Sequence, residues 1–276
     1  MMNDRRPIGV FDSGVGGLSV WRKIARQLPH EDTIYFADQL HIPYGTRSLE
    51  QIRQFSEAIT RFLLERSCKA IVIACNTASA AALKHLRETF PFIPFVGMEP
   101  AVKPAAETTQ TRVVGVLATP ATFQGALFAS VVERFANGVR LVNQVCPGLV
   151  EQVEAGKLDA PETGALLRGF LVPIVEANAD TIVLACTHYP FVIESIRRIV
   201  GPGVNVIDPS PAIARQTGRA LAERSLNAPD SRIGQRAFFT SGDRDAFSRV
   251  LHRLVDADGQ IKVAAWRDDR AVFERL

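Results

Sequence analysis

The chain has 276 residues, of which 47% are hydrophobic and 22% charged, and this length suits one large domain or two smaller ones. A formal net charge of +3 is too small to indicate nucleic-acid binding, and the arginines near the C-terminus alternate with acidic residues. No apolar run reaches the roughly 18 residues that cross a bilayer, and the N-terminus has no signal-peptide core. We therefore expect a cytoplasmic protein with neither nucleic acid nor membrane as a partner.

The first hundred residues alternate between short apolar runs and amphipathic stretches. We expect strands at residues 7–12, 33–38, 70–74 and 92–97, and helices ending near residue 28, over 48–66 and over 78–89. The second of these helices has apolar residues at helical spacing, and Ser48 is its expected N-cap. Val- and Ile-rich strands between helices predict parallel sheets that helices cover on both faces.

A second series of strands and helices follows residue 110. Two prolines make Met98–Gln110 the expected crossing between the two series. After Asp208 the chain is expected to return to the first series. We expect strands at 112–118, 139–146, 181–185, 204–208, 236–242 and 261–266, with helices between the first four, over 149–177, over 210–225 and over 244–255.

One motif occurs twice. Residues 70–77 read AIVIACNT and residues 181–188 read TIVLACTH, so a buried strand ends in a cysteine and polar residues each time. This repeat predicts two α/β units related by pseudo-symmetry. Ligands of parallel α/β sheets bind beyond the carboxyl ends of the strands. The strand ends carry Asp12 with Ser13, Asp38, Cys75 with Asn76 and Thr77, and Cys186 with Thr187 and His188.

The four cysteines are Cys68, Cys75, Cys146 and Cys186, and none forms a C-x-x-C pair, so we expect free thiols, no zinc site and no metal. Buried small apolar fillers are one reading of Cys75 and Cys186. The other is chemical, because a helix N-terminus can lower the pKa of a thiol from about 8.5. Two thiols suit inversion of a carbon centre, in which one group removes a proton and the other returns one to the opposite face.

The glycine-rich stretch Phe11–Val20 allows three interpretations. With Asp38 it resembles a degraded dinucleotide fingerprint, or it is a tight turn, or it is an anion-binding turn that positions Asp12 and Ser13. His188 either lies satisfied in the core or adjusts the Cys186 thiol. Spacing alone makes Glu154 an ordinary helix-surface acid, and we expect the other four histidines at the surface.

Five motifs together resemble the glutamate racemases of the aspartate/glutamate racemase superfamily. They are IGVFDSGVGGLSV, FADQLHIPYGTRS, IVIACNTASA, VGMEPAVKPA and VLACTHYP, and the resemblance runs from Ile8 to about Pro211. It implies a cofactor-independent enzyme that supplies D-glutamate for bacterial peptidoglycan. It also implies two α/β domains with parallel-rich sheets flanked by helices and the active site in the cleft between them. Residues 1–98 and 211–276 would form the first domain and residues 99–210 the second.

The resemblance also implies roles for individual residues. Cys75 and Cys186 would be the two acid/base groups, with Cys75 deprotonating the D form and Cys186 the L form. The supporting residues would be Asp12 and Asp38 near Cys75, and Glu154 and His188 near Cys186. The substrate would be bound by Asp12, Ser13, Tyr44, Gly45, Asn76, Thr77, Thr187 and His188.

One departure from the family pattern concerns LATPAT, where Ala118 stands at a usual glycine while Thr119 and Thr122 keep their hydroxyls. We therefore give a substrate contact from that loop less weight. The alternatives are an aspartate or related amino-acid racemase, an NAD(P)-dependent oxidoreductase and a non-catalytic amino-acid clamp. The expected partner is the small-molecule substrate glutamate, and assembly as a homodimer is left open.

Overall fold

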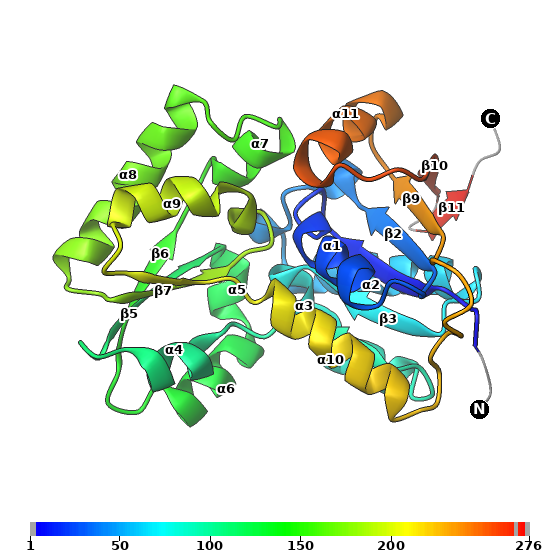
Figure 1. The fold of residues 1–276 in the computed structure, drawn as a ribbon, viewed down its shortest axis with the longest axis horizontal. Helices are drawn as coiled ribbons and strands as arrows, with labels where there is room; N and C mark the ends of the chain where they lie inside the picture. Colours follow the sequence, from blue (N-terminus) through cyan, green and yellow to red (C-terminus); the bar gives the residue numbers. More distant parts are fainter. Residues whose placement is uncertain (1–3, 268–269, 274–276) are drawn as a thin grey trace.

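The computed structural model describes residues 4–267 and 270–273 and contains two β-sheets. The strand order is β11-β10-β9-β2-β1-β3-β4 in the seven-stranded sheet and β6-β5-β7-β8 in the four-stranded sheet. Figure 1 shows the two sheets side by side, each with its own helices. The strands are β1 (Ile8–Asp12), β2 (Thr33–Ala37), β3 (Ala70–Ile73), β4 (Phe95–Gly97), β5 (Val113–Ala118), β6 (Arg140–Val145), β7 (Thr181–Ala185), β8 (Asn205–Ile207), β9 (Arg236–Thr240), β10 (Gln260–Arg267) and β11 (Arg270–Phe273).

We call the seven-stranded sheet and its helices the first lobe, and the four-stranded sheet and its helices the second lobe. Strands pair in parallel in both sheets, except that β10 and β11 are antiparallel. The central strands β1, β3 and β7 are buried at every residue, as expected for parallel strands covered on both faces. Parallel register places the carboxyl ends of β1, β2 and β3 at one edge of the first sheet.

The helices flank the sheets in both lobes (Figure 1). None of the described helices combines the length and apolar character that crossing a bilayer requires. The helices are α1 (Leu18–Gln27), α2 (Leu49–Leu64), α3 (Asn76–Thr89), α4 (Val102–Thr108), α5 (Pro120–Gln124), α6 (Ala126–Phe135), α7 (Leu149–Glu154), α8 (Pro161–Glu176), α9 (Ile193–Val200), α10 (Ser210–Ala222) and α11 (Arg244–Val255), with short 3₁₀ turns η1 (Gln39–His41), η2 (Tyr44–Thr46) and η3 (Tyr189–Val192).

Local sequence signals locate several of these elements. Ser48 caps α2 as predicted, because its side chain accepts from the Gln51 backbone N–H while the Gln51 side chain accepts from the Ser48 N–H. The segment predicted as a crossing contains a helix as well. In this helix, α4, Val102 and Ala105 are buried in the apolar cluster of the second lobe.

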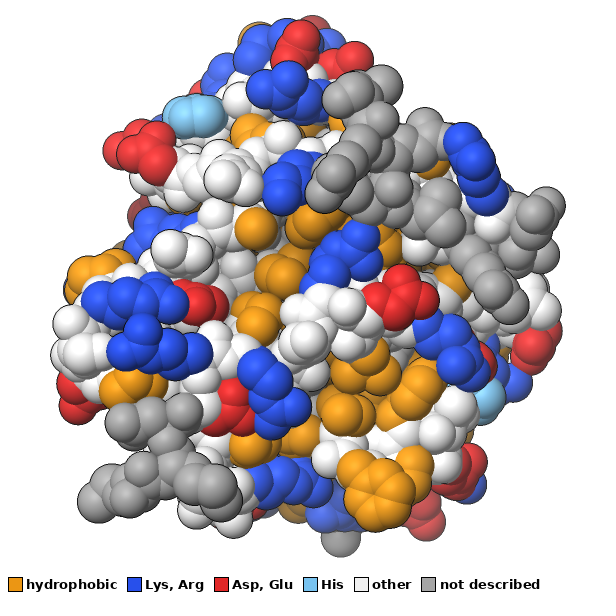
Figure 2. Space-filling model, turned by 90° about the vertical axis from the view of Figure 1, so that its right-hand side faces the viewer, with side chains coloured by type: hydrophobic (Ala, Val, Ile, Leu, Met, Phe, Trp, Pro, Cys, Tyr) orange, Lys and Arg blue, Asp and Glu red, His pale blue; other side chains and the backbone are white. Residues whose placement is uncertain are grey.

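The end of the chain joins the first lobe. Strand β9 pairs in parallel with β2, β10 pairs with β9, and α10 packs against α1. Strand β11 was not predicted. The exact residues at which the two predicted domains divide stay a prediction. On the face of the first lobe in Figure 2, Lys and Arg side chains lie among acidic and apolar ones.

Candidate active site

The two repeated strand ends place their cysteines at the junction of the lobes. Cys75 follows β3 and caps α3, where its Sγ accepts from the Ala78 N–H at 3.4 Å and lies 3.9 Å from Oγ of Ser13. Cys186 follows β7, and its Sγ lies 3.7 Å from Nδ1 of His188. Only 4% of Cys75 and 7% of Cys186 is exposed. All four cysteines of the chain are free thiols.

Both sulfur-bearing residues line one small cavity. Its free volume of about 20 Å³ holds about one water molecule, so the lobes are closed on each other. The walls come from both lobes and include several side chains with polar groups. The lining residues are Ser13, Pro43, Tyr44, Gly45, Cys75, Asn76, Thr77, Thr119, Val150, Cys186, Thr187 and His188.

Burial decides the protonation of Cys75. Removal from water raises the pKa of this thiol above its ordinary value, and the nearby charge of Asp12 raises it further. The N–H of Ala78 and the hydroxyl of Ser13 lower the pKa by less. The N–H groups at the start of α3 thus lower the pKa of Cys75 as expected, but desolvation is the larger effect in this closed structure, so the pKa as a whole is raised.

On the other side of the cavity, His188 connects Cys186 to Glu154. Nε2 of His188 lies 2.7 Å from Oε1 of Glu154. Burial alone would lower the pKa of His188, but its hydrogen bonds to Cys186 and Glu154, and their charges, raise it well above its ordinary value. Glu154 is thus not an ordinary surface acid, and a protonated His188 places a positive charge beside Cys186.

Asp12 contacts both lobes. Its Oδ1 accepts from the Gly14 N–H at 2.9 Å, and its Oδ2 accepts from the Thr187 hydroxyl at 3.0 Å. The carboxyl is fully buried, and burial raises its pKa above the ordinary range. The resemblance assigned Asp12 to the Cys75 side, but its hydrogen bond to Thr187 also ties it to the strand end that carries Cys186.

Asp38 is surrounded by donors rather than open to the cavity. Tyr44 donates its hydroxyl to Oδ2 at 2.6 Å, Ser241 and the Trp266 indole donate to Oδ1 at 2.9 Å each, and Nδ1 of His41 lies 2.9 Å from Oδ2. His41 was expected at the surface. It is instead partly buried, because its ring stacks on Phe55 and contacts this carboxylate.

The turn after β1 needs glycines because the second lobe packs closely against its backbone. A side chain on Gly14 would collide with Oε1 of Glu154, and one on Gly16 would collide with Nδ1 of His188. The backbone N–H of Val15 donates to that same Glu154 oxygen at 2.6 Å. The turn therefore binds the Glu154 carboxylate through its backbone. That it also positions Asp12 and Ser13 on a substrate anion stays a prediction.

Asn76 is the polar residue of the cavity whose hydrogen bonds are unmade. Only 3% of the residue is exposed, and neither the amide oxygen nor the amide nitrogen has a partner among the described residues. Beside it, the hydroxyls of Thr77, Thr119 and Thr122 lie 2.9 to 3.3 Å apart. Thr119 lines the cavity even though Ala118 precedes it.

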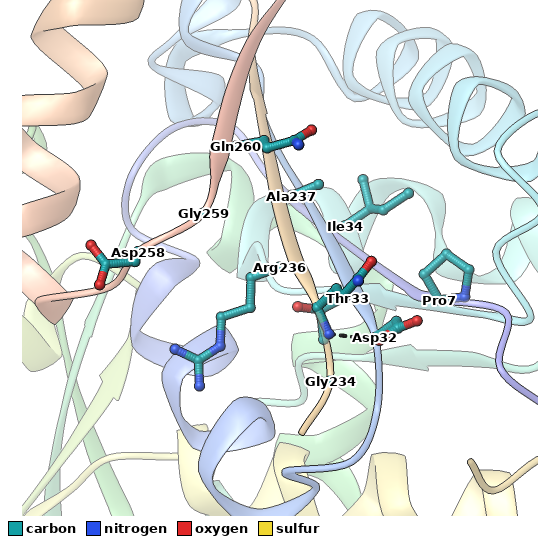
Figure 3. A pocket seen from close by; sticks show the side chains of 11 residues that line it. Pro7, Asp32, Thr33, Ile34, Gly234, Arg236, Ala237, Asp258, Gly259 and Gln260 are labelled. Atoms are coloured by element: carbon teal, nitrogen blue, oxygen red, sulfur yellow. Dashed lines mark hydrogen bonds between the residues drawn. The ribbon is translucent and has the colours of Figure 1, made fainter. Parts of the chain in front are cut away.

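Larger cavities lie away from the thiols. Figure 3 shows one of about 610 Å³ at the amino ends of β2 and β9, lined by Asp32, Thr33 and Arg236 among others. Another, of about 1000 Å³, lies between α10 and the segment leading into α4. Neither lining includes a cysteine or a histidine. Within the described ranges, no three His, Cys, Asp or Glu side chains converge on a metal position.

Comparison with known proteins agrees with the motifs. The model of the Asp/Glu/Hydantoin racemase family matches residues 8–217. A glutamate racemase of Roseiflexus sp. (strain RS-1) is 50% identical over 250 residues, covering 90% of this chain and 92% of the relative. The chain belongs to this racemase family. Another glutamate racemase, from Ectopseudomonas mendocina (strain ymp), is 48% identical over 263 residues, covering 95% and 100% of the two chains.

Solved structures of glutamate racemases share the fold of this family member. One from Bacillus anthracis has a TM-score of 0.87 at 32% identity, covering 97% of this chain and 100% of that one. One from Escherichia coli, in complex with L-glutamate, has a TM-score of 0.82 at 34% identity, covering 94% and 98%. The predicted fold, two parallel-rich α/β units flanked by helices, is confirmed.

The sequence predictions for this racemase-family site separate into two groups in space. The carboxylates of Asp12, Asp38 and Glu154 lie behind the cavity wall and contact it through other side chains. Pro43 and Val150 line the cavity, and Gln39, Ser241 and Trp266 bond to the carboxylates, without having been singled out from sequence. The predicted residues that line the cavity are Ser13, Tyr44, Gly45, Cys75, Asn76, Thr77, Cys186, Thr187 and His188.

Proposed function

We propose that the protein interconverts L- and D-glutamate without a cofactor, using Cys75 and Cys186 as a pair of proton-transfer groups. The observation that carries the proposal is that these two thiols, from strands of different sheets, line the same closed cavity. A two-sided arrangement suits a reaction in which a proton leaves one face of Cα and another arrives on the opposite face. The named relatives and the glutamate complexes of the solved neighbours support the choice of substrate.

The cavity offers polar groups for an amino acid. Asn76 presents a donor and an acceptor that lack partners, and α3 begins at this residue, so its first N–H groups favour a carboxylate. Ser13, Thr77 and Thr187 add hydroxyls. These groups, with Tyr44, Gly45 and His188, would hold the two carboxylates and the ammonium of glutamate.

In the L-to-D direction, the Cys186 thiolate takes the Cα proton of L-glutamate. The electron pair of the broken C–H bond passes into the α-carboxylate, and the Cys75 thiol delivers its proton to the opposite face. The products are D-glutamate, a Cys186 thiol and a Cys75 thiolate. The reverse direction exchanges the two roles. The raised pKa of Cys75 suits its role as the group that delivers a proton, and the cation at His188 lies beside the Cys186 sulfur that receives one.

The Cα proton of an amino acid is very weakly acidic, so electrostatic stabilisation has to supply most of the catalysis. Donors around the α-carboxylate and a substrate ammonium that stays charged would stabilise the carbanion. Exclusion of water strengthens these interactions. The closed cavity fits this requirement, and the product would supply D-glutamate for peptidoglycan.

Two other functions fit the site less well. A dinucleotide would need the Asp38 carboxylate for a ribose, but Tyr44, Ser241 and Trp266 already donate to it. A non-catalytic clamp has no need for two thiols in its cavity. Aspartate or a related amino acid is the remaining alternative within the racemase reading.

The proposal is tested by incubating L-glutamate, D-glutamate and L-aspartate with the protein in deuterated water. We expect deuterium at Cα of the glutamate product and loss of optical rotation, with much slower reaction of aspartate. Cys75→Ala and Cys186→Ala should each abolish racemisation. An inactive wild type, or a Cys75→Ala variant that still racemises glutamate, would contradict the proposal.

A further inference from the structure

The Glu154 carboxylate has a hydrogen-bond donor in the first lobe, the side chain of Gln39. Nε2 of Gln39 donates to Oε2 of Glu154 at 2.8 Å. The other oxygen, Oε1, accepts from the Val15 N–H and contacts His188. Within the described part of the chain, Gln39 is the residue that donates a hydrogen bond to Oε2. It therefore fixes the rotation of the carboxylate that faces His188.

The orientation of the Gln39 amide is itself fixed. Thr240, at the end of β9, donates its hydroxyl to Oε1 of Gln39 at 2.8 Å. The same hydroxyl oxygen accepts from the Gly242 N–H at 2.9 Å, which directs its own proton towards Gln39. Thr240 is fully buried. The amide oxygen thus faces Thr240, and the amide nitrogen faces Glu154.

Glu154 needs this support because of where it lies. It is the last residue of α7, a helix of six residues, and its side chain reaches across to the first lobe. The ionisable groups facing His188 are Cys186 after β7, Glu154 on α7 and Asp12 at the end of β1. Of these, Glu154 contacts Nε2, which leaves Nδ1 for the sulfur.

We propose that Gln39 and Thr240 are positioning residues that orient Glu154 against His188 and so hold the imidazole at Cys186. The inference rests on the proposed racemase function. It gives the C-terminal segment, which lies outside the region of strongest resemblance, a role at the second thiol. The chain of contacts runs from Thr240 through Gln39, Glu154 and His188 to Cys186.

The test uses Gln39→Leu and Thr240→Val, with racemisation of both glutamate enantiomers and NMR titration of His188 as readouts. Losing one hydrogen bond to a buried charged group should lower kcat about tenfold, with KM little changed. The pKa of His188 should fall, because a freed Glu154 carboxylate stabilises the imidazolium less. Because both residues act through one contact, the double variant should be no slower than Gln39→Leu alone.

Two further variants separate positioning from a general structural effect. Thr240→Ser keeps the hydroxyl and should restore both kcat and the His188 titration. Gln27→Leu removes an exposed glutamine amide on α1 and should change neither. Since Gln39 is partly exposed, Gln39→Leu should fold even if Thr240→Val does not.

The proposal is overturned if Gln39→Leu has wild-type kcat, or if its kcat falls while the His188 titration stays unchanged. Failure of the proposed function gives a different result. A wild type that does not racemise glutamate contradicts that function, while the His188 titration in Gln39→Leu still decides whether Gln39 orients Glu154.

Discussion

Asn76 shows how single residues of this site favour ligand binding over stability. Its amide is buried beside Cys75 without a hydrogen-bond partner. A buried polar group without a partner costs about 1–3 kcal/mol, because it has lost water and gained nothing. Bound glutamate would supply the missing partners, so the cost is removed when the substrate binds.

We predict that Asn76→Ala separates binding from stability. The variant should raise KM for glutamate about tenfold, because contacts made in the bound state are lost. Its free energy of unfolding should stay the same or increase, since no hydrogen bond of the ligand-free protein is broken. Steady-state kinetics and urea denaturation would measure both effects. A variant destabilised by more than about 2 kcal/mol would show that the amide has partners in the folded protein.

At the scale of elements, hydrogen bonds hold the amino end of β7 in place. Its carboxyl end carries Cys186, and Asp180 stands just before its first residue. The Asp180 carboxylate accepts from the Thr109 hydroxyl at 2.6 Å and from the backbone N–H groups of Gln110 and Thr111 at 2.6 and 3.0 Å. These bonds tie the segment after α4 to the strand that positions the second thiol.

We predict a pH-dependent loss of stability in Asp180→Asn. Burial would raise the pKa of Asp180, but hydrogen bonds from Thr109 and the following N–H groups outweigh it and lower the pKa from 3.8 to about 2. A lowered pKa in the folded state stabilises the protein above pH 3.8, and this contribution is lost as the pH falls towards 2. Because solvent screens this site, we expect about 1 kcal/mol at neutral pH.

Thermal or urea unfolding of both proteins between pH 2 and 7 would measure that difference. Racemisation by Asp180→Asn at neutral pH should match the wild type, because Asp180 lies at the opposite end of β7 from Cys186. A stability difference that grows as the pH falls would contradict the assignment.

At the scale of the whole molecule, hydrogen bonds cross between the lobes around the cavity. Ser19 donates to the Thr187 carbonyl at 2.9 Å, Thr187 donates to Asp12, and Val15 donates to Glu154. Residues of both sheets also share one apolar cluster. Since the closed cavity has room for about one water, the lobes have to separate before an amino acid can enter.

We predict that glutamate shifts this opening towards the closed form. Small-angle scattering should give a smaller radius of gyration with saturating D-glutamate than without ligand. Iodoacetamide should alkylate Cys75 and Cys186 only through the open form, so glutamate should slow both reactions. Cys68, buried in the first lobe away from the cavity, is the internal control and should react at an unchanged rate. Equal alkylation rates of the two cavity thiols with and without ligand would contradict the prediction.

The sequence by itself determined the local elements and the chemistry at their ends. Helix α11 occupies the predicted residues 244–255, and β7 the predicted 181–185, because apolar periodicity is a property of neighbouring residues. The repeat also predicted that Cys75 and Cys186 act as a pair, because each stands at the carboxyl end of a parallel strand. Their strands belong to different sheets, so the packing of the two lobes is what brings the thiols to one cavity.

Only the tertiary structure decided which distant residues form hydrogen bonds with the side chains at the ends of these elements. Trp266 and Asp38 are 228 positions apart, and Gln39 and Glu154 are 115 apart. No local pattern marks such pairs, because they are brought together by the pairing of β9 with β2, by the pairing of β10 with β9, and by the packing of one lobe against the other. The raised pKa of Cys75 likewise depends on the tertiary structure. The helix N-terminus is visible in the sequence, but the burial that outweighs it depends on the closed cavity.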